Sequence, residues 1–371
     1  MPMNDLLDLL ALTLVPGLGP RLTQALLDHF GSATAIRSAS RDQLRDVPRV
    51  GAKLAESFAT ALAAADPQAE YDRAVAAGVS LFAKSVPGFP SALKSLVDAP
   101  HLLYVRGTII PEDANAVAIV GSRNCSPYGL KTAHRLGSGL ARAGFTVVSG
   151  LALGIDGAAH RGALDGGGRT LAVLANGLAS VYPPQHVELA EQVAKQGALL
   201  TETPMLMSPQ RGMFHARNRL ISGLALAVVV IEANDKSGAL ITARHAAEQG
   251  RDVFTVPANV DSHHSAGSLK LLRDGAKLIR DIDDLLEDLS GMKVPVRPAP
   301  EAGPLRVGPP PVPTNLDPVQ QKLWDLLEEP RHSDDIVRHM GLSAGELSKL
   351  LLMMEMKKVI RRAPGNVYER R

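Results

Sequence analysis

The middle of the chain alternates short apolar runs with longer stretches in which apolar residues recur at helical spacing. Six runs rich in β-branched residues are predicted strands: Val117–Val120, Phe145–Ser149, Thr170–Leu174, Ala198–Thr201, Leu226–Ile231 and Val253–Val256. Runs such as LALAVVVI are apolar throughout, which is typical of parallel strands covered by helices on both faces. The pattern predicts an α/β fold with a doubly wound, mostly parallel sheet, and ligand sites at the carboxyl ends of its strands.

The regions on either side of these alternating segments have different residue patterns. Residues 1–80 show helical spacing without a convincing strand, residues 291–314 are dense in proline, and residues 315–371 return to a regular pattern. A proline-rich stretch with few apolar anchors is typical of an extended, semi-rigid linker. We therefore expect a helical domain at 1–80, the α/β domain at 81–290, a linker at 291–314 and a small domain at 315–371.

Composition and charge narrow the class of protein. The chain has 371 residues and is 45% hydrophobic, so most of it should fold into packed cores. Its net charge is only +2, so any nucleic-acid site must be a local patch. Cys125 is the only cysteine, which fits a reducing compartment. The N-terminal segment lacks the positive charges of a signal peptide and no apolar run is long enough to span a bilayer, so we expect a cytoplasmic protein that does not enter membranes.

Two segments near the N-terminus each contain a similar glycine-containing turn before a helical stretch. VPGLGPRLTQALLDHF (Val15–Phe30) and VPRVGAKLAESF (Val47–Phe58) both place glycine before a helical stretch, a layout typical of a helix-hairpin-helix. Glycine lets such a turn expose backbone N–H groups that can hold a DNA phosphate at the helix N-terminus. Similar turns also serve only for packing, so DNA contact by this region stays open.

The loop after the first predicted strand is suited to an anion. In AVAIVGSRNCSPYG (Ala116–Gly129), Gly121 permits close backbone approach, and Ser126 is a good N-cap for the next helix. Arg123 lies in this loop, where the positive end of the helix already favours negative charge. The glycines do not follow G-x-G-x-x-G, so a dinucleotide site is weakly supported and we expect no cofactor.

Two further loops carry cationic residues at the same edge of the predicted sheet. In RGMFHARNRLISGLA, an aromatic ring between guanidiniums suits a single nucleic-acid strand, because the base stacks on the ring and the arginines bind phosphates. The alternative is that its arginines pair with carboxylates and its phenylalanine packs inside. In NDKSGALITARHAAEQG, Lys236 stands at the positive end of a helix, Ser237 can cap that helix, and Gly238 leaves room for a ligand oxygen.

The sequence offers little support for catalysis or metal binding. Asp156 and His160 are four residues apart on a predicted helix, so both side chains could face one site. No H-E-x-x-H motif or third ligand accompanies them, so we expect a buried hydrogen-bonded pair, with no catalytic residue and no metal site.

The last 57 residues, 315–371, predict a winged-helix domain. LDPVQQKLWDLLEEP, HSDDIVRHMG and LSAGELSKLLLMMEMKK read as three helices, the third with a capping box formed by Ser343 and Glu346, and VIRRAPGNVYER reads as a hairpin. Residues 316–371 hold ten Lys/Arg against nine Asp/Glu, a net of +1. We therefore favour partner binding or an accessory DNA contact over sequence-specific recognition of a duplex.

Several blocks of the chain resemble the DNA-processing protein A (DprA/Smf) family. They are AIVGSRNCSPYG, SGLALGIDGAAHRGAL, GGGRTLAVLANGL followed by YPP, FHARNRLISGLA, VVVIEANDKSGALITARHAAEQGRDVFTVPAN and LLRDGAKLI, and they cover about half of the chain. The resemblance implies an extended Rossmann fold that binds single-stranded DNA and forms homodimers. It also implies that the protein loads the recombinase RecA onto that DNA during natural transformation.

By motif position, the resemblance places the DNA-binding residues on the three loops. They are Gly121, Ser122, Arg123, Arg211, Phe214, Arg217, Asn218, Arg219, Lys236, Ser237 and Gly238. The chain departs from the family pattern at His215, where proline is usual, and in the blocks VPA, LANG and GSLKLL. These departures affect the expected loop shapes more than the expected fold.

Two other functions compete with the DNA-binding mediator. Related Rossmann proteins of the LOG type, which are phosphoribohydrolases of nucleoside monophosphates, carry P-G-G-x-G-T-x-x-E after the corresponding strand. This chain has NDKSGALITA there, without the paired glycines and the catalytic glutamate, so we expect no enzyme. A winged-helix regulator of duplex DNA is the other alternative, and the sparse charge of the third helix argues against it.

Overall fold

The computed structural model describes residues 2–262, 264–290, 316–327, 331–357, 359–363 and 367–370. The chain divides into two compact units, Met1–Glu301 and Ala302–Arg371. The predicted linker at 291–314 and the predicted hairpin turn at 364–366 lie outside the described residues. The predicted limits of the four segments stay predictions.

The first unit begins with six helices packed around a small apolar core. They are α1 (Met3–Thr13), α2 (Pro20–Phe30), α3 (Ala33–Arg37), α4 (Arg41–Arg45), α5 (Ala52–Ala64) and α6 (Pro67–Ala76). Leu26, Ile36 and Phe58 are fully buried in this core. The α1–α2 turn contains Gly17 at φ +79° and the α4–α5 turn contains Arg49 at φ +71°, so both predicted hairpins turn through left-handed backbone.

A nine-stranded sheet follows, in the order β1-β2-β6-β5-β4-β3-β7-β8-β9. Its strands are β1 (Val79–Ala83), β2 (Leu102–Gly107), β3 (Ala116–Gly121), β4 (Thr146–Ser149), β5 (Thr170–Val173), β6 (Ala198–Thr201), β7 (Ala227–Ile231), β8 (Asp252–Thr255) and β9 (Lys277–Leu278). Every pair from β6 to β9 is parallel, whereas β1–β2 and β2–β6 are antiparallel. The six predicted strands and the mostly parallel sheet are confirmed.

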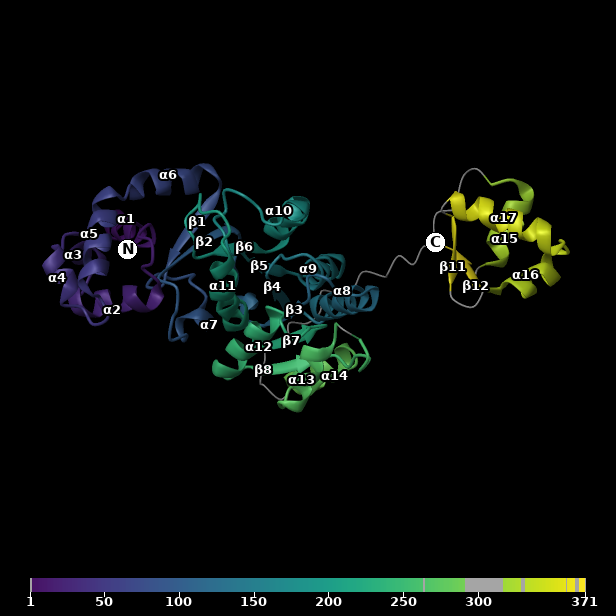
Figure 1. The fold of residues 1–371 in the computed structure, drawn as a ribbon. Helices are drawn as coiled ribbons and strands as arrows, with labels where there is room; N and C mark the ends of the chain where they lie inside the picture. Colours follow the sequence, from purple (N-terminus) through teal and green to yellow (C-terminus); the bar gives the residue numbers. More distant parts are fainter. Residues whose placement is uncertain are drawn as a thin grey trace. The chain divides into compact units, whose positions relative to one another are not determined.

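Helices cover both faces of this sheet (Figure 1). The helices of this region, from β1 to the end of the described part of the first unit, are α7 (Ser91–Lys94), α8 (Pro127–Arg142), α9 (Ile155–Asp165), α10 (Val187–Gln196), α11 (Arg211–Leu224), α12 (Ala239–Glu248), α13 (Ala266–Arg273) and α14 (Ile282–Ser290). Along β3 the side chains alternate: Val117 and Ile119 belong to the apolar core with α8 and α9, while Ala118 and Val120 belong to the core with α11 and α12. This alternation explains why the strand is apolar at every position.

The chain order places a switch point at β3. The chain passes from β3 to β4 on one side and later returns to place β7 on the other, where Gly121 pairs with Ile231. The loops that leave β3 and β7 therefore diverge to opposite faces of the sheet and leave a crevice at its carboxyl edge.

The second unit is a winged helix, as predicted. It contains α15 (Pro318–Leu326), β10 (Arg331–His332), α16 (Ser333–Met340), α17 (Ala344–Met356), β11 (Ile360–Ala363) and β12 (Val367–Arg370), with strand order β10-β12-β11. Trp324, Ile336 and Met354 lie in its core. Ser343 and Glu346 form the predicted capping box at the start of α17.

Among the described helices, none is both long enough and apolar enough to cross a membrane.

Candidate functional site

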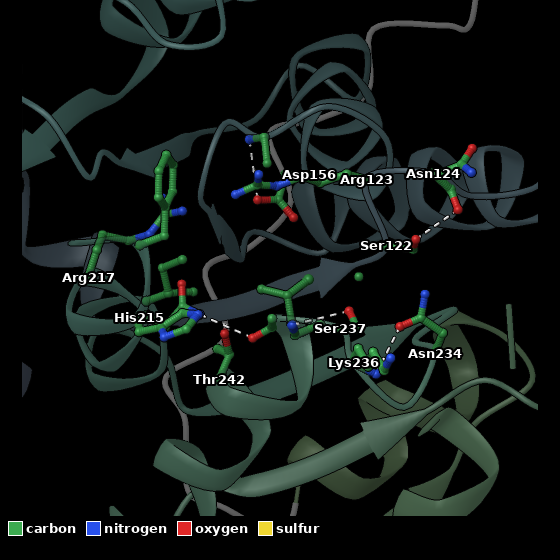
Figure 2. A pocket seen from close by; sticks show the side chains of 18 of the residues that line it. Ser122, Arg123, Asn124, Asp156, His215, Arg217, Asn234, Lys236, Ser237 and Thr242 are labelled. Carbon is green, nitrogen blue, oxygen red and sulfur yellow. Dashed lines mark hydrogen bonds between the residues drawn. The ribbon is translucent and has the colours of Figure 1, made fainter. Parts of the chain in front are cut away.

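A cavity of about 610 Å³ opens in the crevice at the carboxyl ends of β3 and β7. The β3–α8 loop, helix α11 and the segment from β7 into α12 supply most of its lining, and Ala152 and Asp156 add to it from the segment between β4 and α9. Figure 2 shows side chains converging on the cavity from these segments, among them Ser122, Arg123, Asn124, His215, Arg217, Asn234, Lys236 and Ser237. The three segments meet at one edge of the sheet, as predicted, but the second of them is the helix α11 and not a loop.

The β3–α8 loop is fixed by a residue of the neighbouring strand. Glu232, directly after β7, accepts the backbone N–H of Ser122 at 2.8 Å through its carbonyl oxygen. Its carboxylate accepts the Ser126 N–H at 2.7 Å and the Ser126 hydroxyl. Ser126 in turn caps α8, accepting Gly129 N–H at 3.1 Å. Arg123 therefore lies in a loop that Glu232 fixes by hydrogen bonds on both sides of the arginine, at Ser122 and at Ser126.

Gly121 is required by packing between strands. A Cβ on Gly121 would lie 1.9 Å from the carbonyl oxygen of Ile231, so any side chain would separate β3 from β7. Gly238 is different, because a Cβ there would meet no atom within 4 Å. The space above Gly238 is open to a ligand, as the sequence indicated.

Phe214 places an aromatic ring at the cavity wall. The ring is half-buried and lines the cavity, and the Arg123 guanidinium lies over it with Cζ 4.9 Å from the ring centroid. The ring of Tyr182 lies next to it, with the two centroids 5.7 Å apart. Phe214 therefore does not pack wholly inside, which was the alternative to a stacking role.

Arg217 is buried beneath the cavity floor and is only 6% exposed. Its guanidinium donates to the carbonyl oxygens of Gly150, at 2.8 Å, and of Val173. Burial lowers the pKa of Arg217 to about 10, an effect that Asp156 opposes, so the guanidinium stays charged at neutral pH. Its Nε has no hydrogen-bond partner among the described residues.

Asp156 balances this buried charge. It accepts the N–H groups of Gly150 at 3.2 Å and Ala152 at 3.3 Å, and burial raises its pKa although Arg217 acts against that shift. His160 is also buried, but its Nδ1 bonds to Thr170 Oγ1 at 2.6 Å, and burial lowers its pKa to about 3. Within the described residues the two side chains do not bond to each other, so the predicted pair is wrong. Each helps to fix the sheet edge separately.

Arg219 does not line the cavity. It lies two residues beyond Arg217 on α11 and bonds to Glu202 at 2.6 Å, with Asp98 at 3.6 Å. Burial raises the pKa of Glu202, and the Arg219 guanidinium acts against this shift. The other ten of the eleven predicted site residues line the cavity.

The loop from β7 into α12 is ordered by its own hydrogen bonds. Asn234 Oδ1 accepts Lys236 N–H at 3.0 Å, and Ser237 Oγ accepts Ala239 N–H at 3.3 Å. Asn218 on α11 donates to the Gly238 carbonyl at 3.1 Å, so it shapes the loop. Arg123, Arg211 and Lys236 are exposed, and within the part of the chain that the structure describes none of them has an ion pair.

Several contributors were not predicted from the sequence. Asn124, His215, Asn234 and Thr242 also line the cavity, and Glu232 and Tyr182 lie at its margin. Asn124 and Asn234 are each the third residue after the end of a strand, β3 and β7, and a polar residue at that place is a signal that the sequence offers. Among the described residues, no group of three metal-ligating side chains is placed to hold a metal ion.

Comparison with known proteins agrees with the geometry. The family model described as DNA recombination-mediator protein A matches residues 80–290, more than half of the chain. The chain belongs to this family. The models for a DprA winged helix domain and a SAM-like helix-hairpin-helix tandem match residues 307–366 and 9–66 of this DprA-family chain.

Individual DprA and Smf proteins are similar over long stretches. The chain is 34% identical to protein Smf of Synechocystis sp. over 391 residues, which cover 98% of each chain. It is 39% identical to DNA processing protein DprA of Bacillus subtilis over 213 residues, 57% of this chain and 72% of that one. Curated relatives of this kind thus match both the α/β region and, for Synechocystis, nearly the whole length.

Two solved structures share the fold. DprA of Streptococcus pneumoniae superposes with a TM-score of 0.67 at 31% identity, covering 78% of this chain and 99% of that one. DNA processing protein A of Helicobacter pylori superposes with a TM-score of 0.53 at 31% identity, covering 58% and 96%. The Helicobacter pylori protein has a single-stranded DNA binding mode.

Proposed function

We propose that the cavity binds single-stranded DNA with little dependence on base sequence. The observation that supports this most is the grouping of three exposed cations, Arg123, Arg211 and Lys236, around the half-buried ring of Phe214, with no ion pair to any residue that the structure describes. Cations that are not neutralised by a carboxylate can bind phosphates, and an aromatic ring stacks on any base. The single-stranded DNA binding mode of the Helicobacter pylori relative supports the same assignment.

The eleven predicted residues then divide into five roles. Arg123, Arg211 and Lys236 bind phosphates, while Phe214 stacks on a base. The backbone at Ser122, Ser237 and Gly238 approaches the strand, and Gly121 keeps β3 close to β7. Three residues support the walls from inside the fold: Arg217, Asn218 and Arg219.

We propose binding without catalysis. The carboxylate that lines the cavity, Asp156, accepts two backbone N–H groups and faces the charge of the buried Arg217, which is the environment of a structural carboxylate. The loop into α12 reads NDKSGALITA and provides no glutamate at the position where the phosphoribohydrolases carry theirs. These features favour a DNA-binding mediator over the nucleotide-cleaving alternative.

Membership of the family supports the wider role. We propose that the protein acts as a homodimer that protects incoming single strands and loads RecA onto them during natural transformation, in the cytoplasm. The winged helix serves partner binding or accessory DNA contact in this scheme, since residues 316–371 have a net charge of only +1.

The test is a fluorescence anisotropy titration with labelled oligothymidylate and a labelled duplex, at two salt concentrations. We expect tighter binding to the single strand and a log–log salt slope near −2, because each phosphate contact on a single strand contributes roughly −0.7. Arg123→Ala and Lys236→Ala should each reduce the slope by about 0.7. Lys195→Ala, an exposed lysine on α10, is the matched control and should change nothing. Equal affinity for the duplex, unaffected by either cavity variant, would overturn the assignment.

A further inference from the structure

Tyr182 is an exposed aromatic residue at the margin of the cavity. The residue is 41% exposed, so core packing does not account for it, and no side-chain hydrogen bond engages its hydroxyl among the described residues. It lies in the segment between β5 and α10, far in sequence from Phe214 on α11. The fold nevertheless brings the two rings to 5.7 Å between centroids.

The backbone that carries Tyr182 is fixed on both sides. Before it, the buried Asn176 donates to the carbonyl oxygens of Gly177, at 3.0 Å, and Ser180, at 2.8 Å. After it, the buried ring of His186 bonds through Nδ1 to the Leu151 carbonyl at 2.9 Å. An exposed ring on a fixed backbone is preorganised, so a ligand that uses it loses little conformational entropy.

The angle between the two rings restricts what they can bind together. The planes of Tyr182 and Phe214 are tilted by 58°. Neighbouring bases of a duplex are nearly parallel, so two bases stacked on these two rings must be splayed apart. A flexible single strand can adopt that arrangement, whereas a duplex cannot do so without breaking its own stacking.

We propose that Tyr182 is a second base-stacking residue, and that with Phe214 it forms a splayed two-base platform that selects single strands over duplexes. This inference rests on the proposed function of the cavity. The cations of the cavity hold phosphates of either kind of DNA. The pair of rings supplies the discrimination, because only unstacked bases fit both planes.

The experiment compares Tyr182→Ala, Tyr182→Leu and Tyr182→Phe in the full chain, with Tyr128→Ala as the control for removing an exposed tyrosine. Oligothymidylate and duplex affinities are measured by anisotropy. We expect Tyr182→Ala to weaken single-strand binding about tenfold, within the range found for loss of one base–aromatic stack, and to leave duplex binding unchanged. Tyr182→Phe should stay within about twofold of wild type, and Tyr182→Leu should behave as the alanine variant because it lacks a ring.

A second readout locates the stack. In a series of strands, each carries a single 2-aminopurine, placed one position further along in each strand. The quenching of its fluorescence should be lost at one position in Tyr182→Ala and at a neighbouring position in Phe214→Ala.

If Phe214→Ala weakens binding while Tyr182→Ala matches Tyr128→Ala, the platform is wrong and the proposed cavity function stands. If wild-type protein fails to bind oligothymidylate, or Phe214→Ala and Arg123→Ala have no effect, the cavity function itself is wrong. If Tyr182→Leu binds oligothymidylate as tightly as wild type, apolar contact and not stacking operates at this position, and the platform is wrong.

Discussion

Glu232 and Ser126 lie 106 positions apart in the sequence, and the Glu232 carboxylate accepts both the N–H and the hydroxyl of Ser126. Glu232 has a left-handed backbone, with φ +48°, and its carbonyl oxygen also accepts the Ser122 N–H. One buried residue at the end of β7 thus positions the loop that carries Arg123. The cavity depends on this link across the switch point.

Glu232→Ala should weaken both the fold and the site. Two half-buried donors, the N–H and the hydroxyl of Ser126, lose their acceptor, and the free energy of unfolding should fall by about 1–3 kcal/mol. The loosened loop should reduce affinity for oligothymidylate as well. Urea unfolding and anisotropy measure the two effects, with Glu248→Ala on the exposed side of α12 as control. An unchanged affinity in a destabilised Glu232 variant would show that the loop does not position Arg123.

Gly238→Ala should separate stability from binding. Gly238 has φ −60° and ψ −20°, which alanine adopts readily, and a Cβ there meets no atom within 4 Å. We expect the free energy of unfolding to stay the same or rise by about 0.4–1 kcal/mol. If a DNA phosphate approaches this backbone, the added methyl group should lower the affinity for single strands. Undiminished affinity would remove Gly238 from the binding surface.

Arg219→Met should destabilise the protein without acting on DNA directly. It leaves Glu202, which is 22% exposed in its side chain, without its partner at 2.6 Å. The loss of one member of a buried ion pair costs about 3–5 kcal/mol, and the partial exposure of Glu202 favours the lower end. Adding Glu202→Gln should recover part of the loss. Urea unfolding of the single and double variants measures this, and a salt slope of DNA binding equal to that of wild type is expected.

The buried His160 should make stability depend on pH. Burial lowers its pKa from 6.5 to about 3, so the unfolded chain takes up a proton that the folded chain does not. The stability contributed by the neutral ring is present above pH 6.5 and is lost as the pH falls from 6.5 towards 3, at up to about 1.4 kcal/mol per pH unit. The free energy of unfolding of His160→Gln should fall less steeply in that interval than that of wild type. Parallel pH profiles would contradict this.

The fold was largely predictable because its signals are local. Each central strand is an apolar run with turn residues at its ends, and burial on both faces is visible in the run itself. β1, β2 and β9 were not predicted. β9 is a two-residue strand with both residues exposed and β1 is a partly exposed edge strand, but β2 is an apolar run that is buried over residues 102–105 and carries the same signal as the central strands.

The site was predictable only in part, and α11 shows why. Arg217 and Arg219 are two residues apart on a helix, so they face different sides and cannot both line one cavity. Sequence alone does not say which one faces it, because that depends on Glu202 and Asp98, which approach from other segments. Tyr182 gave no local signal either, since its neighbour Phe214 is brought to it by the sheet.

The pairing of β3 with β7 also bears on synthesis of the protein. The cavity takes Arg123 from one side of this pairing and Lys236 from the other, and the chain between them includes three other strands of the sheet. A nascent chain that ends before β7 contains Arg123 but lacks Lys236 and the pairing of β3 with β7. If the cavity binds DNA as proposed, fragments of that length should not bind DNA through it, because the two cations are brought together only when β7 has joined the sheet.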